Sequence, residues 1–172
     1  EFVRRELQPH DDEIERSGVV PPHLRSRLAE QGLFGVNTPR AYGGLGLSML
    51  GSCLATEELA KAHAAFYYLS GINVHLGSKS IELGGSEEQK QRWLPDLASG
   101  RIIAALALTE PEVGSDAASI ATSARREGDS YVLNGRKIYI TNAAEAGVFT
   151  VFATLDPGAG ARGITAFLVE AG

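Results

Sequence analysis

The first segment that could bind a ligand is residues 109–116, TEPEVGSD, which directly follows an apolar run at residues 102–108. It combines two hydroxyl groups, several carboxylates and a glycine, so it can present hydroxyl and backbone N–H donors to a planar polar ligand or to a phosphate. The alternative is an ordinary exit from a strand, in which Asp116 caps the next turn. The loop by itself leaves both interpretations open.

A second candidate is residues 139–142, YITN, which place an aromatic ring next to β-branched and polar side chains. These residues could face a ligand. They could equally form the end of a hairpin strand, because aromatic and β-branched side chains pack well on a sheet.

Other kinds of site find little support in the sequence. Residues 158–163, GAGARG, match the dinucleotide pattern GxGxxG, but a strand follows where that site needs a helix, so we interpret them as a loop between two strands. The four histidines show no spacing that would place two metal ligands on one helix face. No GxSxG motif of a serine hydrolase is present.

Length and composition restrict the number of domains, the classes of binding partner and the redox compartment. A chain of 172 residues suits one domain or two small ones, and we expect no membrane span. The net charge of −5, without a long block of one sign, argues against a nucleic-acid partner. Cys53 is the only cysteine, which excludes an internal disulfide and suits a reducing compartment. The charged start lacks the apolar region of a signal peptide.

The two candidate segments lie in the second half of the chain, and the predicted secondary structure changes near residue 100 from helices to strands. Helical spacing of apolar residues predicts helices over residues 1–17, 22–32, 48–65, 66–83 and from 87 onward. Ser48 is a good N-cap, and Ser86 with Gln89 fits a capping box. Pro95 is expected to break or kink the last helix.

Strands are predicted in the second half, at residues 102–108, 148–154 and 164–169. Asn134-Gly135 is typical of a type I′ turn, which predicts a hairpin between residues 130–133 and 136–141. Helices followed by an antiparallel sheet indicate the α+β class.

Five segments, taken in order, resemble the acyl-CoA dehydrogenase family of flavoproteins. They are residues 41–47 (AYGGLGL), 57–60 (EELA), 85–90 (GSEEQK), 108–116 (LTEPEVGSD) and 134–142 (NGRKIYITN). Two positions depart from the family pattern. Val113 stands where the family usually has a small residue, and Tyr139 stands where many members have tryptophan.

The resemblance implies an amino-terminal helical domain at residues 1–105, followed by the first part of an antiparallel, β-barrel-like middle domain at residues 106–172. The family's carboxy-terminal helical domain would be absent. We therefore expect the chain to be a fragment that, by itself, neither oxidises acyl-CoA nor holds FAD tightly.

The resemblance also implies the cofactor FAD and the residues that face it. Leu106, Leu108 and Thr109 would meet the pyrimidine edge of the flavin. Gly114 and Ser115 would approach the ribityl and phosphate region, with Ser115 also near the CoA part of the substrate. Tyr139, Ile140 and Thr141 would lie against the isoalloxazine, with the Thr141 hydroxyl near N5.

The implied reaction is α,β-desaturation of an acyl-CoA thioester, in which a glutamate removes the α-proton and the β-hydride passes to flavin N5. That glutamate would lie outside these residues, and Glu110 belongs to the loop instead. The implied partners are acyl-CoA and an electron-transfer flavoprotein, in a homotetramer or homodimer. The implied compartment is the bacterial cytoplasm or the mitochondrial matrix.

Two alternatives stay open beside the dehydrogenase. The first is an acyl-CoA oxidase, or a related flavin oxidase or monooxygenase, on the same scaffold. The second is a truncated, non-catalytic paralogue.

Overall fold

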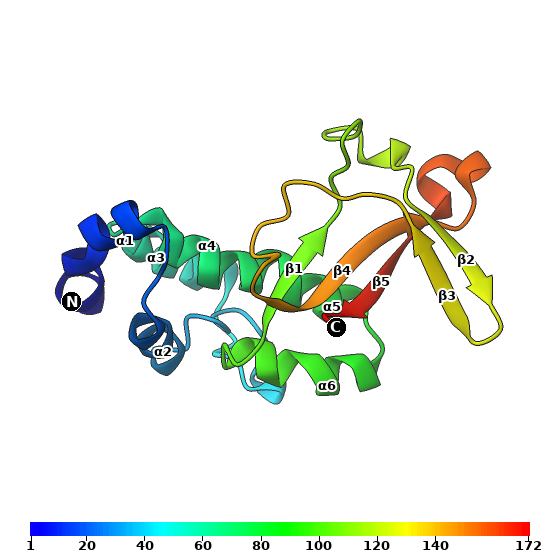
Figure 1. The fold of residues 1–172 in the computed structure, drawn as a ribbon. Coiled ribbons are helices and arrows are strands. Elements are labelled where there is room, and N and C mark those ends of the chain that lie inside the picture. The colour runs from blue at the N-terminus through cyan, green and yellow to red at the C-terminus, as the bar shows by residue number, and fades with distance from the viewer. The chain divides into compact units, whose positions relative to one another are not determined.

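The chain folds into two compact units, Glu1–Ala104 and Ala105–Gly172, in a computed structural model that describes all of residues 1–172. The first unit is helical up to the start of strand β1, and the other strands of the sheet lie in the second unit (Figure 1). The predicted α+β class, with helices first and strands second, is confirmed. None of the helices is long and apolar enough to cross a membrane.

The first unit consists of short helical elements, several of which pack around one apolar core. Leu7, Leu28, Phe34 and Phe66 are fully buried in this core. The elements are η1 (Val3–Leu7), η2 (Gln8–His10), α1 (Asp11–Ser17), α2 (Pro22–Glu30), η3 (Arg40–Tyr42), α3 (Met49–Leu59), α4 (Ala64–Ile72), η4 (Asn73–Ser78), α5 (Lys79–Gly84) and α6 (Glu87–Ala98).

Two helix starts in this unit follow directly from local sequence. The Ser48 side chain accepts a hydrogen bond from the Gly51 backbone N–H at the start of α3. Ser86 and Gln89 form the predicted capping box at the start of α6, with both reciprocal hydrogen bonds present. Each bond satisfies a backbone donor that the helix itself leaves unpaired.

Helix α6 does not end at Pro95 but continues through it to Ala98. Proline removes one backbone hydrogen bond and disfavours a helix interior. Leu94 and Leu97 are fully buried on either side of it. Packing of these two side chains is the physical reason that the last turn stays helical.

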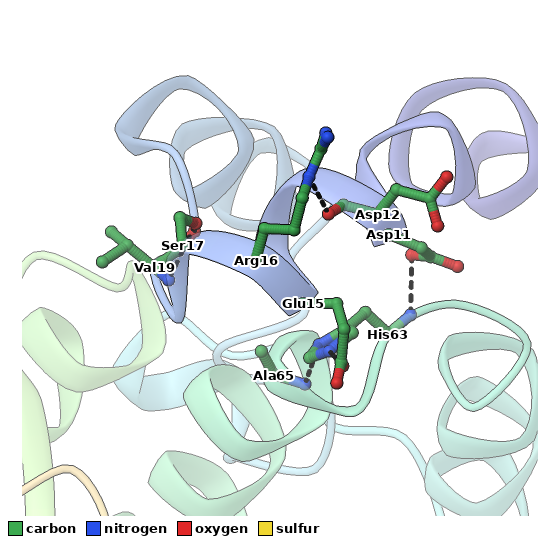
Figure 2. Close-up of polar contacts among 8 residues, drawn as sticks. All are labelled: Asp11, Asp12, Glu15, Arg16, Ser17, Val19, His63 and Ala65. Carbon is green, nitrogen blue, oxygen red and sulfur yellow. Dashed lines mark hydrogen bonds and ion pairs between the residues drawn. The ribbon is translucent and has the colours of Figure 1, made fainter.

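His63 caps helix α4 and makes hydrogen bonds that connect it to α1 (Figure 2). Its ring Nδ1 accepts from the Ala65 backbone N–H at 3.1 Å, and its own backbone N–H donates to Asp11 Oδ1 at 2.8 Å. Because Nδ1 is an acceptor, the ring proton lies on Nε2, which is 2.8 Å from Glu15 Oε2. One residue thus joins two helices that lie far apart in the sequence.

The segment predicted as a buried helix over residues 66–83 forms three consecutive helical pieces, α4, η4 and α5. Asn73 is fully buried, donates from Nδ2 to the Leu97 carbonyl at 3.0 Å, and accepts at Oδ1 from the Ala104 N–H at 2.8 Å. Leu76 and Leu83 of the same segment are exposed, so it is not buried along its whole length.

The second unit carries a sheet in the order β1-β4-β2-β3, with β5 paired to β4. Its elements are β1 (Ile103–Ala107, which begins in the first unit), η5 (Ala117–Ser119), β2 (Ser123–Glu127), β3 (Ser130–Asn134), β4 (Ala146–Thr154), η6 (Pro157–Gly163) and β5 (Ile164–Glu170). The sheet is mixed rather than wholly antiparallel, because β2 meets β4 in parallel at Ser123↔Thr154. The glycine-rich residues 158–163 join two strands, as predicted, and lie within η6.

The predicted hairpin at Asn134-Gly135 is wrong. The hairpin instead joins β2 to β3, with Glu127 opposite Ser130 and a turn at Gly128-Asp129. Gly128 has the positive φ, 60°, that such turns need. Residues 135–141 form no strand.

Candidate functional site

The carboxylate of Glu110 is the buried centre of the loop at residues 109–116. Only 5% of the residue is exposed. Its Oε2 accepts from the Ala121 backbone N–H at 2.7 Å, and its Oε1 accepts from the Thr122 N–H at 2.9 Å. These bonds tie the loop to the segment that leads into β2.

Lys137 brings a third segment to the same carboxylate. Its Nζ lies 2.7 Å from Glu110 Oε1 and donates to the Leu108 carbonyl oxygen at 2.9 Å. The Lys137 side chain is 10% exposed, so the pair is shielded from water. Breaking a buried pair of this kind leaves an uncompensated charge, which is costly.

The hydrogen bonds around Glu110 keep it ionised. Burial raises the pKa of its carboxyl, but the hydrogen bonds from Lys137 and from the Ala121 and Thr122 backbone outweigh burial and lower the pKa to about 2. A carboxylate with this pKa, held by these donors, does not accept a substrate proton near neutral pH.

A backbone hydrogen bond also joins the loop at residues 109–116 to the residues just before 139–142. The Ile138 N–H donates to the Thr109 carbonyl oxygen at 3.0 Å. Together with the two bonds of Lys137, this contact fixes the register between residues 108–110 and 137–138. The structure therefore brings Leu108 and Thr109 next to the segment that leads directly into Tyr139, Ile140 and Thr141.

Gly114 and Ser115 lie beyond a tight turn. Glu110 and Val113 exchange both backbone hydrogen bonds, at 2.9 and 3.1 Å, across Pro111 and Glu112. Val113, which departs from the family pattern, closes this turn through its backbone. Gly114 and Ser115 follow it and are exposed. No hydrogen bond joins either residue to residues 139–141.

Residues 139–142 adopt an uncommon backbone. Tyr139 has φ 55° and Asn142 has φ 64°, both in the left-handed region. Asparagine tolerates this region, whereas a bulky residue such as tyrosine rarely adopts it. Tyr139 is 89% exposed. Strain of this kind costs about 1–3 kcal/mol and is concentrated at functional sites.

The remaining predicted residues lie on β1, at its end or within the two segments. Leu106 is half-buried on β1, and Leu108 and Thr109 are half-buried where β1 ends. Ile140 is half-buried, and Thr141 is exposed beside the strained backbone. The arrangement offers an aromatic ring, two exposed hydroxyls and backbone groups to a planar polar ligand.

Sequence reasoning missed Lys137 as the residue that joins the two segments. Glu110 and Lys137 are 27 residues apart, so no local spacing indicates their pairing. A lone lysine in a strand-like sequence is usually solvent-exposed, and it gave no signal of burial. A buried partner for Glu110 follows only from the tertiary structure.

Both units match known domain families. Residues 1–101 match "Acyl-CoA dehydrogenase, N-terminal domain", and residues 105–172 match "Acyl-CoA dehydrogenase, middle domain". An acyl-CoA dehydrogenase of Bacillus subtilis is 38% identical over 170 residues, which are 99% of this chain and 45% of that protein.

Solved structures agree with this match. Butyryl-CoA dehydrogenase from Megasphaera elsdenii aligns with a TM-score of 0.91 at 37% identity, over 99% of this chain and 46% of that one. A Mycobacterium smegmatis glutaryl-CoA dehydrogenase in complex with FADH2 aligns with a TM-score of 0.89 at 37% identity, over 98% of this chain and 42% of that one. The chain spans less than half the length of these relatives.

Proposed function

We propose that this chain, which belongs to the acyl-CoA dehydrogenase family, supplies part of the FAD site of an enzyme that desaturates acyl-CoA thioesters. The observation that carries the proposal is the contact between the loop at residues 108–116 and the segment at residues 137–142. Lys137 and Ile138 bind that loop directly. Segments held in a fixed relation can orient a bound group for reaction.

The residues present fit a cofactor of this kind. A β-carbon on Gly114 would meet nothing within 4 Å, and its φ lies outside the positive region, so packing within the chain does not require a glycine there. Close approach of a ligand to the backbone is a reason for glycine at such a place. The exposed Tyr139 ring offers a planar surface for stacking.

Each residue has a proposed role. Leu106, Leu108 and Thr109 would hold the pyrimidine edge of the flavin, and Gly114 and Ser115 the ribityl and phosphate region. Tyr139, Ile140 and Thr141 would lie against the ring system. Ser115 would also contact the CoA part of the substrate.

FAD supplies the hydride acceptor when it is bound. Thr141 would donate a hydrogen bond to flavin N5, the atom that would accept the hydride, and so would orient and polarise that atom. Glu110 is not the base that removes the α-proton, because its carboxylate is buried, paired with Lys137 and has a pKa of about 2. We propose a glutamate outside these 172 residues for that step, and an electron-transfer flavoprotein as the electron acceptor.

The test uses the complete polypeptide that carries residues 1–172. Purified protein should show a bound-flavin absorbance spectrum, and anaerobic addition of acyl-CoA should bleach it. Absence of flavin, or flavin that no acyl-CoA reduces, would overturn the proposal. Rapid reoxidation of the reduced protein by oxygen would instead assign it to the oxidases.

A further inference from the structure

The Glu110–Lys137 ion pair is buried. Its side chains are 5% and 10% exposed, whereas the Lys79–Glu82 pair, at the same 2.7 Å separation, is 27% and 21% exposed. Lys79 and Glu82 also lie three residues apart on one helix. Glu110 and Lys137 instead connect segments that are far apart in the sequence.

The contacts of the pair converge on three segments of the second unit. Glu110 binds the backbone of residues 121 and 122, and Lys137 binds the carbonyl of Leu108. The Thr122 carbonyl in turn accepts from the Thr154 N–H at 2.8 Å, at the end of β4. The pair is thus connected to the sheet, which gives it a rigid support.

Both members of the pair lie close in the chain to residues that are proposed to face the flavin. Tyr139, with its strained backbone, comes two residues after Lys137, and Thr109 immediately precedes Glu110. A displacement of either charged residue therefore moves a residue of the proposed flavin site. Misplacement of about 1 Å in such a site can cost about 100-fold in rate.

We propose that Glu110 and Lys137 are positioning residues for FAD, which set the register between the loop at residues 108–116 and the segment at residues 137–142. Neither side chain touches the cofactor. The pair acts through the Leu108 carbonyl and the backbone on both sides. This inference rests on the proposed function, since it names the residues that arrange that site.

The test compares variants of the complete polypeptide. Lys137→Met keeps most of the aliphatic stem but removes the charge and both hydrogen bonds. Its control, Val148→Ala, opens a cavity at a buried residue of β4, which lies in the same unit but outside both segments. Lys79→Met is a second control, because it removes an ion pair of equal length elsewhere. All measurements are made where circular dichroism shows that each variant is folded.

The expected result is that Lys137→Met weakens FAD binding about tenfold or more in fluorescence titration. At saturating FAD, its absorbance spectrum should move toward that of free FAD. Val148→Ala should lower the melting temperature while leaving FAD affinity and spectrum close to the wild type, and Lys79→Met should leave both unchanged. Equal losses of affinity in Lys137→Met and Val148→Ala would overturn the inference.

A double variant covers the case in which Lys137→Met fails to fold. Glu110→Gln with Lys137→Met removes both charges together, which proteins often tolerate. It still lacks the bond to the Leu108 carbonyl, so it too should bind FAD about tenfold more weakly. Wild-type affinity for FAD in the double variant would overturn the inference but would leave the proposed function standing. A wild-type protein that takes up no FAD would overturn the proposed function and the inference with it.

Discussion

Gly135 lies so close to Thr122 that a β-carbon added to it would be 2.3 Å from the Thr122 hydroxyl oxygen and 2.7 Å from the Thr122 Cα. Thr122 is itself fixed, because its N–H donates to Glu110 and its carbonyl accepts from Thr154. The glycine that suggested a tight turn is therefore needed for close packing against Thr122, in the segment that leads into β2.

Gly135→Ala should destabilise the second unit by about 1–3 kcal/mol, because the new methyl group collides with backbone that cannot move aside. Urea unfolding followed by circular dichroism measures this loss. Gly114→Ala is the matched control, since its β-carbon would meet nothing within 4 Å, and its stability should stay within about 0.5 kcal/mol of the wild type. Equal stability of the two variants would contradict the packing argument.

Acid should weaken the second unit through Glu110. The folded-state pKa of this carboxyl is lowered from 4.5 to about 2, so its contribution is fully present above about pH 4.5 and is lost as the pH falls toward 2. The shift corresponds to something on the order of 3 kcal/mol. Unfolding free energies measured across this range should fall more steeply for the wild type than for Glu110→Gln/Lys137→Met. Parallel curves would count against the role of Glu110.

Thr141→Val should keep the fold, because the two side chains have nearly the same shape and the position is exposed. It should slow reduction of the flavin by acyl-CoA by about 10- to 100-fold, since a hydrogen-bond donor near N5 is lost. Stopped-flow reduction measures this step, with Thr141→Ser as the control that keeps the hydroxyl. An unchanged rate in the valine variant would remove Thr141 from the site.

Ser115→Leu should weaken binding of both FAD and acyl-CoA, because a larger side chain fills the space beside Gly114 and the hydroxyl is lost. The residue is exposed, so the melting temperature should change little. Titration with each ligand separates the two effects, and Ser115→Ala isolates the hydroxyl from the added bulk. Unchanged affinity for both ligands would leave Ser115 as a turn residue only.

His63→Ala should destabilise the first unit by about 1 kcal/mol, because the N-cap of α4 loses its acceptor. His63→Asn, which can also cap a helix, should recover part of the loss. Thermal unfolding of the two variants measures the difference. Glu15→Ala removes the separate acceptor of the Nε2–H, and a loss as large as that of His63→Ala would mean that the cap contributes little.

Elements whose hydrogen bonds join near neighbours could be predicted from the sequence. The capping box of Ser86 and Gln89 spans three residues, so its partners are visible in the sequence and the helix begins where predicted. The strands at β4 and β5 likewise follow from their own β-branched and aromatic residues. The order of the motifs indicated the family, which the match of both units confirms.

Tertiary contacts determine which of two possible turns forms the hairpin and which charged residues pair. Gly128-Asp129 and Asn134-Gly135 both permit a turn, but only the first lets β2 pair with β3 while Gly135 packs against Thr122. Glu110 and Lys137 meet across 27 residues because the folded sheet brings their segments together and excludes water. Local sequence encodes local bonds, whereas contacts between distant residues depend on the packing of the whole unit.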